Sequence, residues 1–274
     1  MLNNLIKIIN YLVFYKKVQK DSFIFDREKD PNLEDIIKSV EKNGIAVIFN
    51  FFQKNECESV VNEVKKFIAT ISETDNNYIK NHGELNFFEM SSHKKTVVNF
   101  RNSNRNSIDG GMIDIFNVNK LPIFNCLPIF NSLHDYYKEK VESILDKNFK
   151  RFNLYINEDV YNTRVSHIDQ TKDEIKCMLY LTDVNSIECG PYSYVIRSHE
   201  KKIRLKLITF ISRALNRIKG LRNYSYHDFQ IPEKALYKVL GASGTLIISN
   251  QSGIHRGMPQ AKGNSRYVLV DNYY

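Results

Sequence analysis

Four residues in the C-terminal half of the chain have the types and spacing to bind a metal ion and an anion. His167 and Asp169 are separated by one residue, His255 follows much later, and Arg266 comes eleven residues after it. Two imidazoles and one carboxylate on one face of an octahedral iron leave the opposite positions open for a chelating co-substrate and oxygen. The sequence therefore predicts a metal centre of His167, Asp169 and His255, with Arg266 as a fixed cation nearby.

The spacing of His167 and Asp169 has a mechanical reason. Residues i and i+2 of a strand point to the same side, so both side chains can bind one ion from one strand end. Alone, this spacing is common, and a capping aspartate beside a surface histidine explains it as well. The prediction therefore depends on the context of the other two residues.

That context is a pair of apolar strands. His255 follows the predicted strand 244–249, and Arg266 opens another in which Val268 and Val270 share its face. An arginine directed into an apolar interior needs an anionic partner, because an unpaired buried cation is costly. A carboxylate co-substrate is such a partner. An edge position reaching solvent, or an internal aspartate, is the alternative for Arg266.

The elements that must position these residues follow from the apolar periodicity. Helices are expected ahead of the strands, and the strands alternate with period two, which favours an α+β, mainly β chain with an antiparallel sandwich or jelly roll and helices on one sheet. The predicted helices are Leu33–Glu41, Asn55–Ser72 and Ser132–Leu145. The predicted strands are Gly44–Phe52, Phe152–Val160, Ile175–Asp183, Ser193–Arg197, Thr245–Ser249 and Tyr267–Asp271.

Length and composition set limits on the class. A chain of 274 residues suits one domain over 1–274, with 1–43 as an N-terminal extension and 200–240 as an insertion. The net charge of +8 suits an anionic small molecule, an anionic membrane surface or nucleic acid, but no nucleic-acid motif is present. Four dispersed cysteines without a C-x-x-C pair fit a reducing cytoplasm. They are Cys57, Cys126, Cys177 and Cys189.

Two segments are amphipathic. Residues 1–17 predict a helix that packs on the domain or lies on a membrane surface, and they are too short to span a bilayer. Residues 201–222 contain eight basic residues and no acidic one, with apolar residues at helical spacing. This segment is a surface helix, a lid over the site, or a contact with an anionic substrate or membrane.

Several stretches resemble the phytanoyl-CoA dioxygenase-like family of Fe(II)/2-oxoglutarate-dependent oxygenases. They run from the strand at Gly44 and the helix start near Cys57 to the C-terminus. The matching motifs are His167-Ile-Asp169, Cys177–Val184, Gly190–His199, and His255 followed by Arg266. Two positions depart from the family pattern. Gly257 stands where serine is common, and Arg197 stands where Pro-Gly is usual.

The resemblance implies a double-stranded β-helix (a cupin-like jelly roll) with Fe(II) bound by His167, Asp169 and His255. It implies that Arg266 binds the distal carboxylate of 2-oxoglutarate. The reaction would consume O₂, release succinate and CO₂, and hydroxylate an unactivated C–H bond. Because Asp169 is a carboxylate, hydroxylation or desaturation is favoured over halogenation. His199 lies in a structural element of the family.

Other residues are weaker candidates. Arg164, Tyr155 and Tyr180 reach the C1 carboxylate of 2-oxoglutarate or face the other sheet. Arg101 and Arg105, in a polar loop, bind an anionic substrate or are solvated. The expected substrate is a small anionic or carrier-linked molecule such as a sugar, a lipid-linked compound or a secondary metabolite. The alternatives are a protein or peptide hydroxylase and a non-catalytic cupin-like binding protein. The sequence indicates no oligomeric state.

Overall fold

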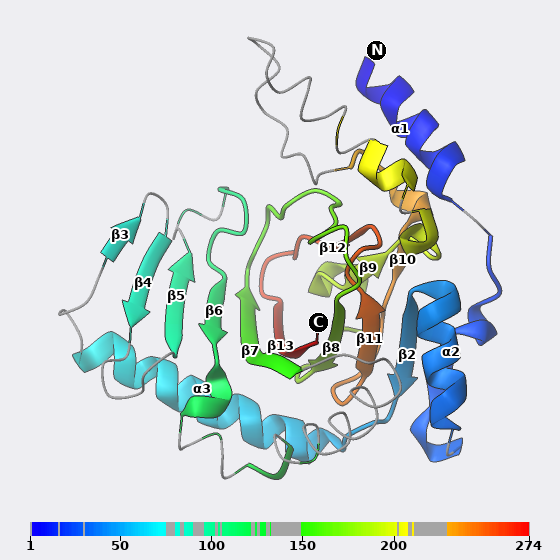
Figure 1. The fold of residues 1–274 in the computed structure, drawn as a ribbon. Coiled ribbons are helices and arrows are strands. Elements are labelled where there is room, and N and C mark those ends of the chain that lie inside the picture. The colour runs from blue at the N-terminus through cyan, green and yellow to red at the C-terminus, as the bar shows by residue number, and fades with distance from the viewer. Residues whose placement is uncertain are drawn as a thin grey trace.

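The computed structural model describes residues 2–15, 17–29, 31–74, 149–201 and 229–273 without a break, and parts of 80–132 and 203–210. Figure 1 shows a large curved sheet, a small sheet beside its centre, and helices at its outer side. The predicted metal ligands and Arg266 line a cavity between the two sheets.

The larger sheet has ten strands in the order β1-β2-β11-β8-β13-β7-β6-β5-β4-β3. Its pairs are antiparallel except for the parallel pair β1 and β2. The strands in that order are Ile24–Asp26, Ile45–Phe49, Leu246–Asn250, Ile175–Tyr180, Ser265–Tyr273, Phe149–Glu158, Ile113–Phe116, Val97–Arg101, Leu85–Glu89 and Lys80–His82. The smaller, antiparallel sheet has the order β10 (Tyr237–Lys238), β9 (Tyr192–Tyr194) and β12 (His255–Gly257).

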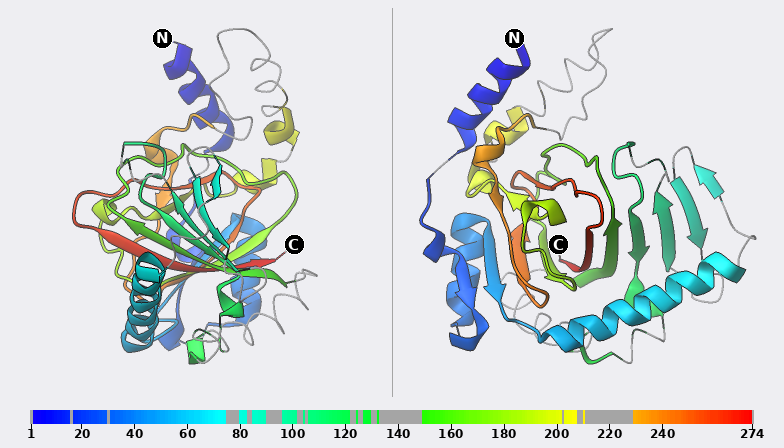
Figure 2. Two further views of the ribbon diagram at one scale, coloured as in Figure 1. Left: turned by 90° about the vertical axis from the view of Figure 1, so that its left-hand side faces the viewer. Right: turned by 180° about the vertical axis from the view of Figure 1, so that it is seen from behind.

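The helices cover the outer face of the larger sheet. Helix α2 (Leu33–Asn43) lies beside β2, and α3 (Lys54–Thr74) runs across the strands, as Figure 2 shows. Helix α1 (Leu2–Phe14) lies apart, near residues 203–207, which are also helical. The described residues also contain six short 3₁₀ turns: Lys20–Ser22, Arg27–Lys29, Val118–Lys120, Ile187–Cys189, Ser198–Lys201 and Glu233–Ala235.

The alternation within β8 explains how the two faces are used. Cys177 and Leu179 point outward into a core shared with α2 and α3, whereas Met178 and Tyr180 point inward. The inward residues pack with Tyr194 and other residues of the smaller sheet. Because side chains of a strand alternate between faces, one strand closes the helical layer and lines the inter-sheet space. The two facing sheets agree with the predicted jelly roll.

Most of the predicted elements form within a few residues of their predicted ends. The N-terminal helix, the helices beginning near residues 33 and 55, and the six predicted strands are present. The strands from β3 to β6, together with β1, β10 and β12, were not predicted. The predicted helix Ser132–Leu145 and the stretch 211–228 of the basic segment lie outside the described residues. No helix in the described ranges is long and apolar enough to cross a membrane.

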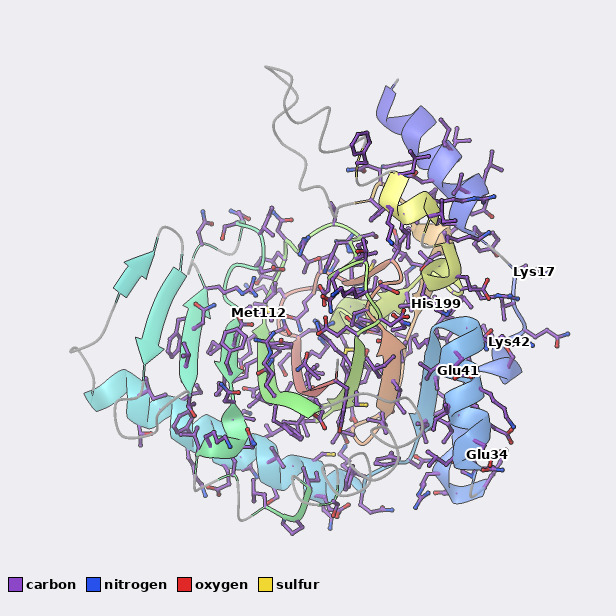
Figure 3. The ribbon with its side chains drawn as sticks, in the orientation of Figure 1. Lys17, Glu34, Glu41, Lys42, Met112 and His199 are labelled. Atoms are coloured by element: carbon purple, nitrogen blue, oxygen red, sulfur yellow. The ribbon has the colours of Figure 1, made fainter. Side chains whose placement is uncertain are left out.

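The turn after β9 accounts for one departure from the family pattern. Arg197 has a φ of 64°, a left-handed conformation that glycine adopts without strain. Its backbone N–H donates to the Asn43 carbonyl at 2.8 Å, and its guanidinium pairs with Glu200 at 2.7 Å. Close by, His199 Nε2 donates to the Glu41 carbonyl of α2 at 2.7 Å (Figure 3), which fits the structural role expected for His199.

Two glycines with similar backbone angles allow a test of the packing between β2 and β11. Gly244 has a φ of 85°, and a Cβ there would lie 2.0 Å from the Phe52 carbonyl oxygen. Gly263 has a φ of 81°, with nothing within 4 Å of its Cβ position. Both alanine variants incur the left-handed strain of about 1 kcal/mol. We expect Gly244→Ala to cost about 2 kcal/mol more, because the backbone must move. Equal urea midpoints for the two variants would contradict this packing.

Candidate metal centre

The two candidate histidines are joined by their own backbone. His167 N–H donates to the His255 carbonyl at 2.8 Å, and His255 N–H donates to the His167 carbonyl at 2.8 Å. This exchange makes them an antiparallel hydrogen-bonded pair, although His167 belongs to no named strand. Side chains of such a pair project from the same face. The imidazole centroids are accordingly 4.7 Å apart.

Each imidazole is oriented by a carbonyl group two residues earlier in the chain. His167 Nδ1 lies 2.8 Å from the Val165 carbonyl oxygen, and His255 Nδ1 lies 2.9 Å from that of Gly253. A carbonyl oxygen only accepts, so Nδ1 carries the proton in both rings. Both Nε2 atoms are then free of protons and available to a metal ion, in the arrangement commonly found for ligating histidines.

Asp169 completes the cluster. Its Oδ1 lies 3.7 Å from His167 Nε2 and 3.8 Å from His255 Nε2, and the candidate ligand atoms lie within 4.8 Å of one another. Asp169 lies at a bend rather than in a strand, so the strand argument for its spacing from His167 is only partly correct. Its backbone N–H donates to the Gln251 carbonyl at 3.1 Å, which fixes the bend against the turn before β12.

The electrostatics of the cluster suit a cation. Burial lowers the pKa of both imidazoles, and the pKa of His167, with His255 and Arg164 near it, falls to about 3. Burial opposes ionisation of Asp169, but Lys176 and the two imidazoles hold the pKa of its carboxyl well below the usual value. Two neutral imidazoles and one carboxylate are the protonation states that metal binding requires.

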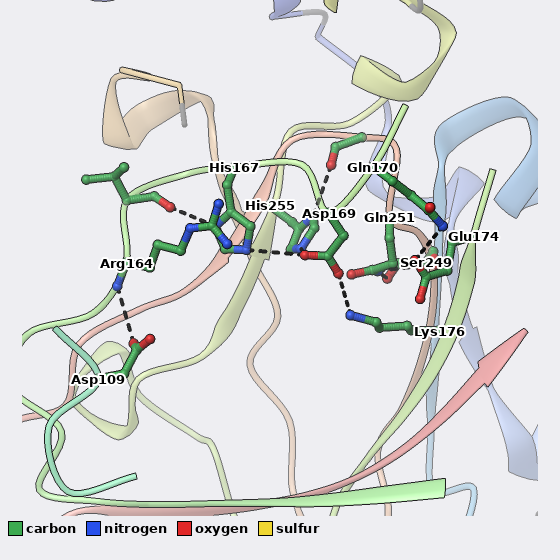
Figure 4. Close-up of polar contacts among 12 residues, drawn as sticks. Asp109, Arg164, His167, Asp169, Gln170, Glu174, Lys176, Ser249, Gln251 and His255 are labelled. Carbon is green, nitrogen blue, oxygen red and sulfur yellow. Dashed lines mark hydrogen bonds and ion pairs between the residues drawn. The ribbon is translucent and has the colours of Figure 1, made fainter. Parts of the chain in front are cut away.

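Lys176 is a residue of the centre that the sequence reasoning missed. It lies on β8, and its ammonium group donates to Asp169 Oδ2 (Figure 4). Burial opposes the charge of Lys176, but Asp169 raises the pKa of this lysine. A signal was available, because period-two alternation puts Lys176 on the same face as Met178 and Tyr180.

The centre opens into a cavity of about 290 Å³ between the sheets, and Arg266 lies within it. Val268 and Val270 line the same cavity, as expected for one face of β13. Arg266 is 8% exposed and its Nη2 donates to Asn157 Oδ1 at 3.3 Å. Its Nε and Nη1 have no hydrogen-bond partner among the described residues. Burial lowers the pKa of this guanidinium.

Gly257, the second departure from the family pattern, lies beside this arginine. A Cβ at position 257 would be 3.0 Å from Arg266 Nη2, so a side chain there would touch the guanidinium. The glycine therefore leaves Arg266 without the hydroxyl neighbour that the family pattern predicts, beside Nε and Nη1 atoms that have no hydrogen-bond partner among the described residues.

Of the three weaker co-substrate candidates, two line the cavity and one does not. Tyr155 and Arg164 line the cavity. Tyr155 OH accepts a hydrogen bond from Asn153 Nδ2 at 3.2 Å. Tyr180 is fully buried, and its hydroxyl donates to the Val239 carbonyl and accepts from Tyr192 N–H. Both functions of the Tyr180 hydroxyl are used by the backbone, and Tyr180 is absent from the cavity lining.

Of the two substrate candidates, the structure places only Arg101 at the cavity. Arg101 lines the cavity but forms ion pairs at 2.9 Å with both Asp114 and Asp109. These carboxylates balance its charge. Asp109 in turn accepts from Arg164 N–H at 3.3 Å, so an aspartate connects the two arginines at the cavity wall. Arg105 lies outside the described residues.

Comparison with known proteins supports the fold. No family model and no curated protein matches the chain. SnoN, the non-heme alpha ketoglutarate dependent epimerase from nogalamycin biosynthesis, superposes with a TM-score of 0.52 at 11% identity, covering 88% of this chain and 82% of SnoN. SnoN in complex with Fe3+, alpha ketoglutarate and nogalamycin RO gives a TM-score of 0.52 at 10% identity, with coverages of 88% and 82%. AviO1 from Streptomyces viridochromogenes Tue57 gives 0.52 at 13% identity, covering 88% and 94%.

These likenesses confirm the predicted fold class. The chain has the cupin-type jelly roll that SnoN, an alpha ketoglutarate dependent enzyme, also has. The family resemblance inferred from the motifs is therefore confirmed at the level of the fold. In the chain described here, that fold surrounds a cluster of two histidines and one aspartate at the wall of a cavity.

The unpaired guanidinium gives a testable difference between two arginines of the cavity. We expect Arg266→Met, in protein free of metal and co-substrate, to leave the free energy of unfolding unchanged or raise it by about 1 kcal/mol, because a poorly compensated buried cation is removed. The control Arg101→Met leaves Asp114 buried without its ion pair, and should lower the free energy of unfolding by about 3 kcal/mol. Urea unfolding measures both. Equal losses in the two variants would show that Arg266 is as well compensated as Arg101.

Proposed function

We propose that the protein is an Fe(II)- and 2-oxoglutarate-dependent dioxygenase that hydroxylates a small molecule. The observation that carries this proposal is the placement of three ligand-type side chains and one buried, unpaired guanidinium around the same cavity. Two imidazoles and a carboxylate suit Fe(II), with positions left for a chelating co-substrate and O₂. A cavity that needed only apolar packing would have no use for a buried arginine with unused donors.

The residues present fit both groups. His167 Nε2, His255 Nε2 and Asp169 Oδ1 would bind the iron, and Arg266 would bind the distal carboxylate of 2-oxoglutarate. The carboxylate would supply the acceptors that Nε and Nη1 lack. When bound, the iron would supply oxidising power by coupling O₂ to the oxidative decarboxylation of 2-oxoglutarate, in which one oxygen atom enters succinate as CO₂ leaves and the other is available to the substrate. The protein residues orient the two groups, and the apolar Met178, Val268 and Val270 keep water from the cavity wall.

Tyr155 and Arg164 are proposed as further contacts of the co-substrate, because both line the cavity. Tyr180 is left out of this proposal because its hydroxyl is already engaged on both sides. Two aspartates already balance the charge of Arg101, so Arg101 offers little net attraction to an anionic substrate. An anionic substrate is thus supported by the basic balance of the chain rather than by Arg101 itself.

Hydroxylation is the proposed outcome, and a small metabolite is the proposed substrate class. SnoN, which has the same fold, binds nogalamycin RO but is an epimerase, so the fold is compatible with more than one oxidative outcome. A protein or peptide hydroxylase and a non-catalytic binding protein are the alternatives. Product mass distinguishes the first, since a peptide substrate would gain one oxygen. Absence of metal and 2-oxoglutarate binding would identify the second.

A reducing cytoplasmic setting is part of the proposal, and the free thiols of Cys57, Cys177 and Cys189 support it.

The proposal is tested by anaerobic titration of the apoprotein with Fe(II) and 2-oxoglutarate. We expect a visible metal-to-ligand charge-transfer band in the wild-type protein and its loss in His167→Ala and His255→Ala, because each variant lacks one nitrogen ligand. His199→Gln is the control, since His199 packs against α2. A well-folded wild-type protein without the band would contradict the proposal.

We also propose that one end of the molecule contacts an anionic membrane surface. Of twelve exposed large apolar residues in the described chain, seven lie on or next to α1 and residues 203–210. Leu12 is 74% exposed and Ile203 is 84% exposed. These two segments touch, because Arg204 Nη1 donates to the Val13 carbonyl at 3.4 Å. Residues 2–14 contain no acidic residue, and exposed Arg204 and Lys206 flank the apolar side chains. Apolar residues among cations suit anionic lipid.

Vesicle sedimentation tests this contact. The wild-type protein should bind vesicles with anionic phospholipid more strongly than zwitterionic vesicles, and salt should weaken the binding. The double variant Leu12→Glu/Ile203→Glu should lower the bound fraction at least about threefold, because it places charge in the apolar surface. Ile187→Glu is the control, because Ile187 is exposed but lies in a 3₁₀ turn near Gly190. Equal binding by the double variant and the control would exclude this surface as the contact.

A further inference from the structure

We infer that Lys176 is a positioning residue that restricts Asp169 to metal binding through one oxygen. The inference rests on the proposed metal centre and goes beyond it, because it concerns how many positions the protein leaves open. The observation is the ion pair between Lys176 Nζ and Asp169 Oδ2 inside the cavity. The lysine side chain is 16% exposed and the aspartate side chain 24%.

The two oxygens of Asp169 have different surroundings. Oδ1 faces both candidate nitrogen ligands, at 3.7 Å and 3.8 Å. Oδ2 faces the ammonium of Lys176 on the other side of the carboxylate, as Figure 4 shows. A charge-assisted hydrogen bond of this kind is among the stronger polar contacts in proteins. Rotation of the carboxylate to present both oxygens to a metal would break it.

Lys176 is itself fixed by its strand. It is the second residue of β8 and pairs with Ser249 of β11 on one side and with Asn272 of β13 on the other. The Asp169 carboxylate is the largest of the favourable influences that raise the pKa of Lys176, and the Glu174 carboxylate adds to it. The Glu174 carboxylate accepts a hydrogen bond from Gln170 Nε2 at 2.7 Å. A central strand thus determines where the lysine meets the aspartate.

The number of open positions makes this contact important. An octahedral ion bound by two imidazoles and one carboxylate oxygen keeps three positions open, which matches a chelating co-substrate plus oxygen. If both oxygens of Asp169 bound the ion, two positions would remain. The co-substrate would then fill the site before oxygen could bind. By binding Oδ2, Lys176 would therefore keep one coordination position of the metal open.

The test counts water molecules bound to Mn(II), so it does not depend on 2-oxoglutarate or on activity. The probe is Mn(II) added to apoprotein in ¹⁷O-enriched water, with electron–nuclear double resonance to count the bound waters. We expect three waters in the wild-type protein and two in Lys176→Met, because the freed Oδ2 joins the metal. Lys176→Arg keeps a donor and should restore three. Lys172→Met is the matched control, since Lys172 is an exposed lysine only four residues earlier.

The outcomes separate the inference from the proposed function. Three waters in Lys176→Met would overturn the inference, as would failure of the wild-type protein to bind Mn(II). A fall from three to two, with no charge-transfer band in any variant, would support the inference while contradicting the proposed co-substrate. If Lys176→Met keeps three waters but loses the band, Lys176 contacts the co-substrate instead, and the inference is wrong. Thermal unfolding of each variant confirms that the compared proteins are folded.

Discussion

The pair of backbone hydrogen bonds between His167 and His255 is the interaction on which the candidate centre depends. It joins the segment after β7 to the first residue of β12, although these lie far apart in the sequence. Because hydrogen-bonded partners in antiparallel pairs project their side chains together, one pairing sets the distance between both imidazoles. The two carbonyl groups that orient Nδ1 lie in the same segments. The distance between the two imidazoles is therefore set by backbone pairing at the edge of the smaller sheet rather than by flexible side chains.

Charge within the cavity is arranged in two different ways. Lys176 with Asp169, and Arg101 with Asp109 and Asp114, are paired within hydrogen-bond distance. Arg266 has a single weak contact with a neutral amide. Buried ions are normally paired, because the cost of removing them from water is large. The contrast identifies Arg266 as a buried cation with no carboxylate at ion-pair distance among the described residues, and it shows why net charge alone is a poor guide to ligand binding.

The sequence predicted the strand that precedes His255 and the strand that Arg266 opens, because both are apolar. It predicted α2 and α3 from helical periodicity and, for α3, from a capping residue. It did not predict β3 to β6, since segments such as Leu85–Glu89 are short and mix polar with apolar residues. Lys176 and the pairing of Arg101 were missed for another reason. Whether a charged side chain is free or paired depends on residues from other strands, and a single sequence does not indicate which strands are neighbours.

Between the end of β7 at Glu158 and the start of β8 at Ile175, the chain forms no strand, and the bridge at His167 is its one ladder contact. A metal ion bound by His167, Asp169 and His255 would join two side chains of this long connection to one side chain of the smaller sheet. By linkage, a ligand that binds only the folded connection stabilises it by an amount that rises with the logarithm of the ligand concentration divided by its Kd. The bound ion would then hold the connection against the smaller sheet. The local opening rate of residues 159–174, seen by hydrogen exchange or limited proteolysis, would report how fully the protein is loaded with metal.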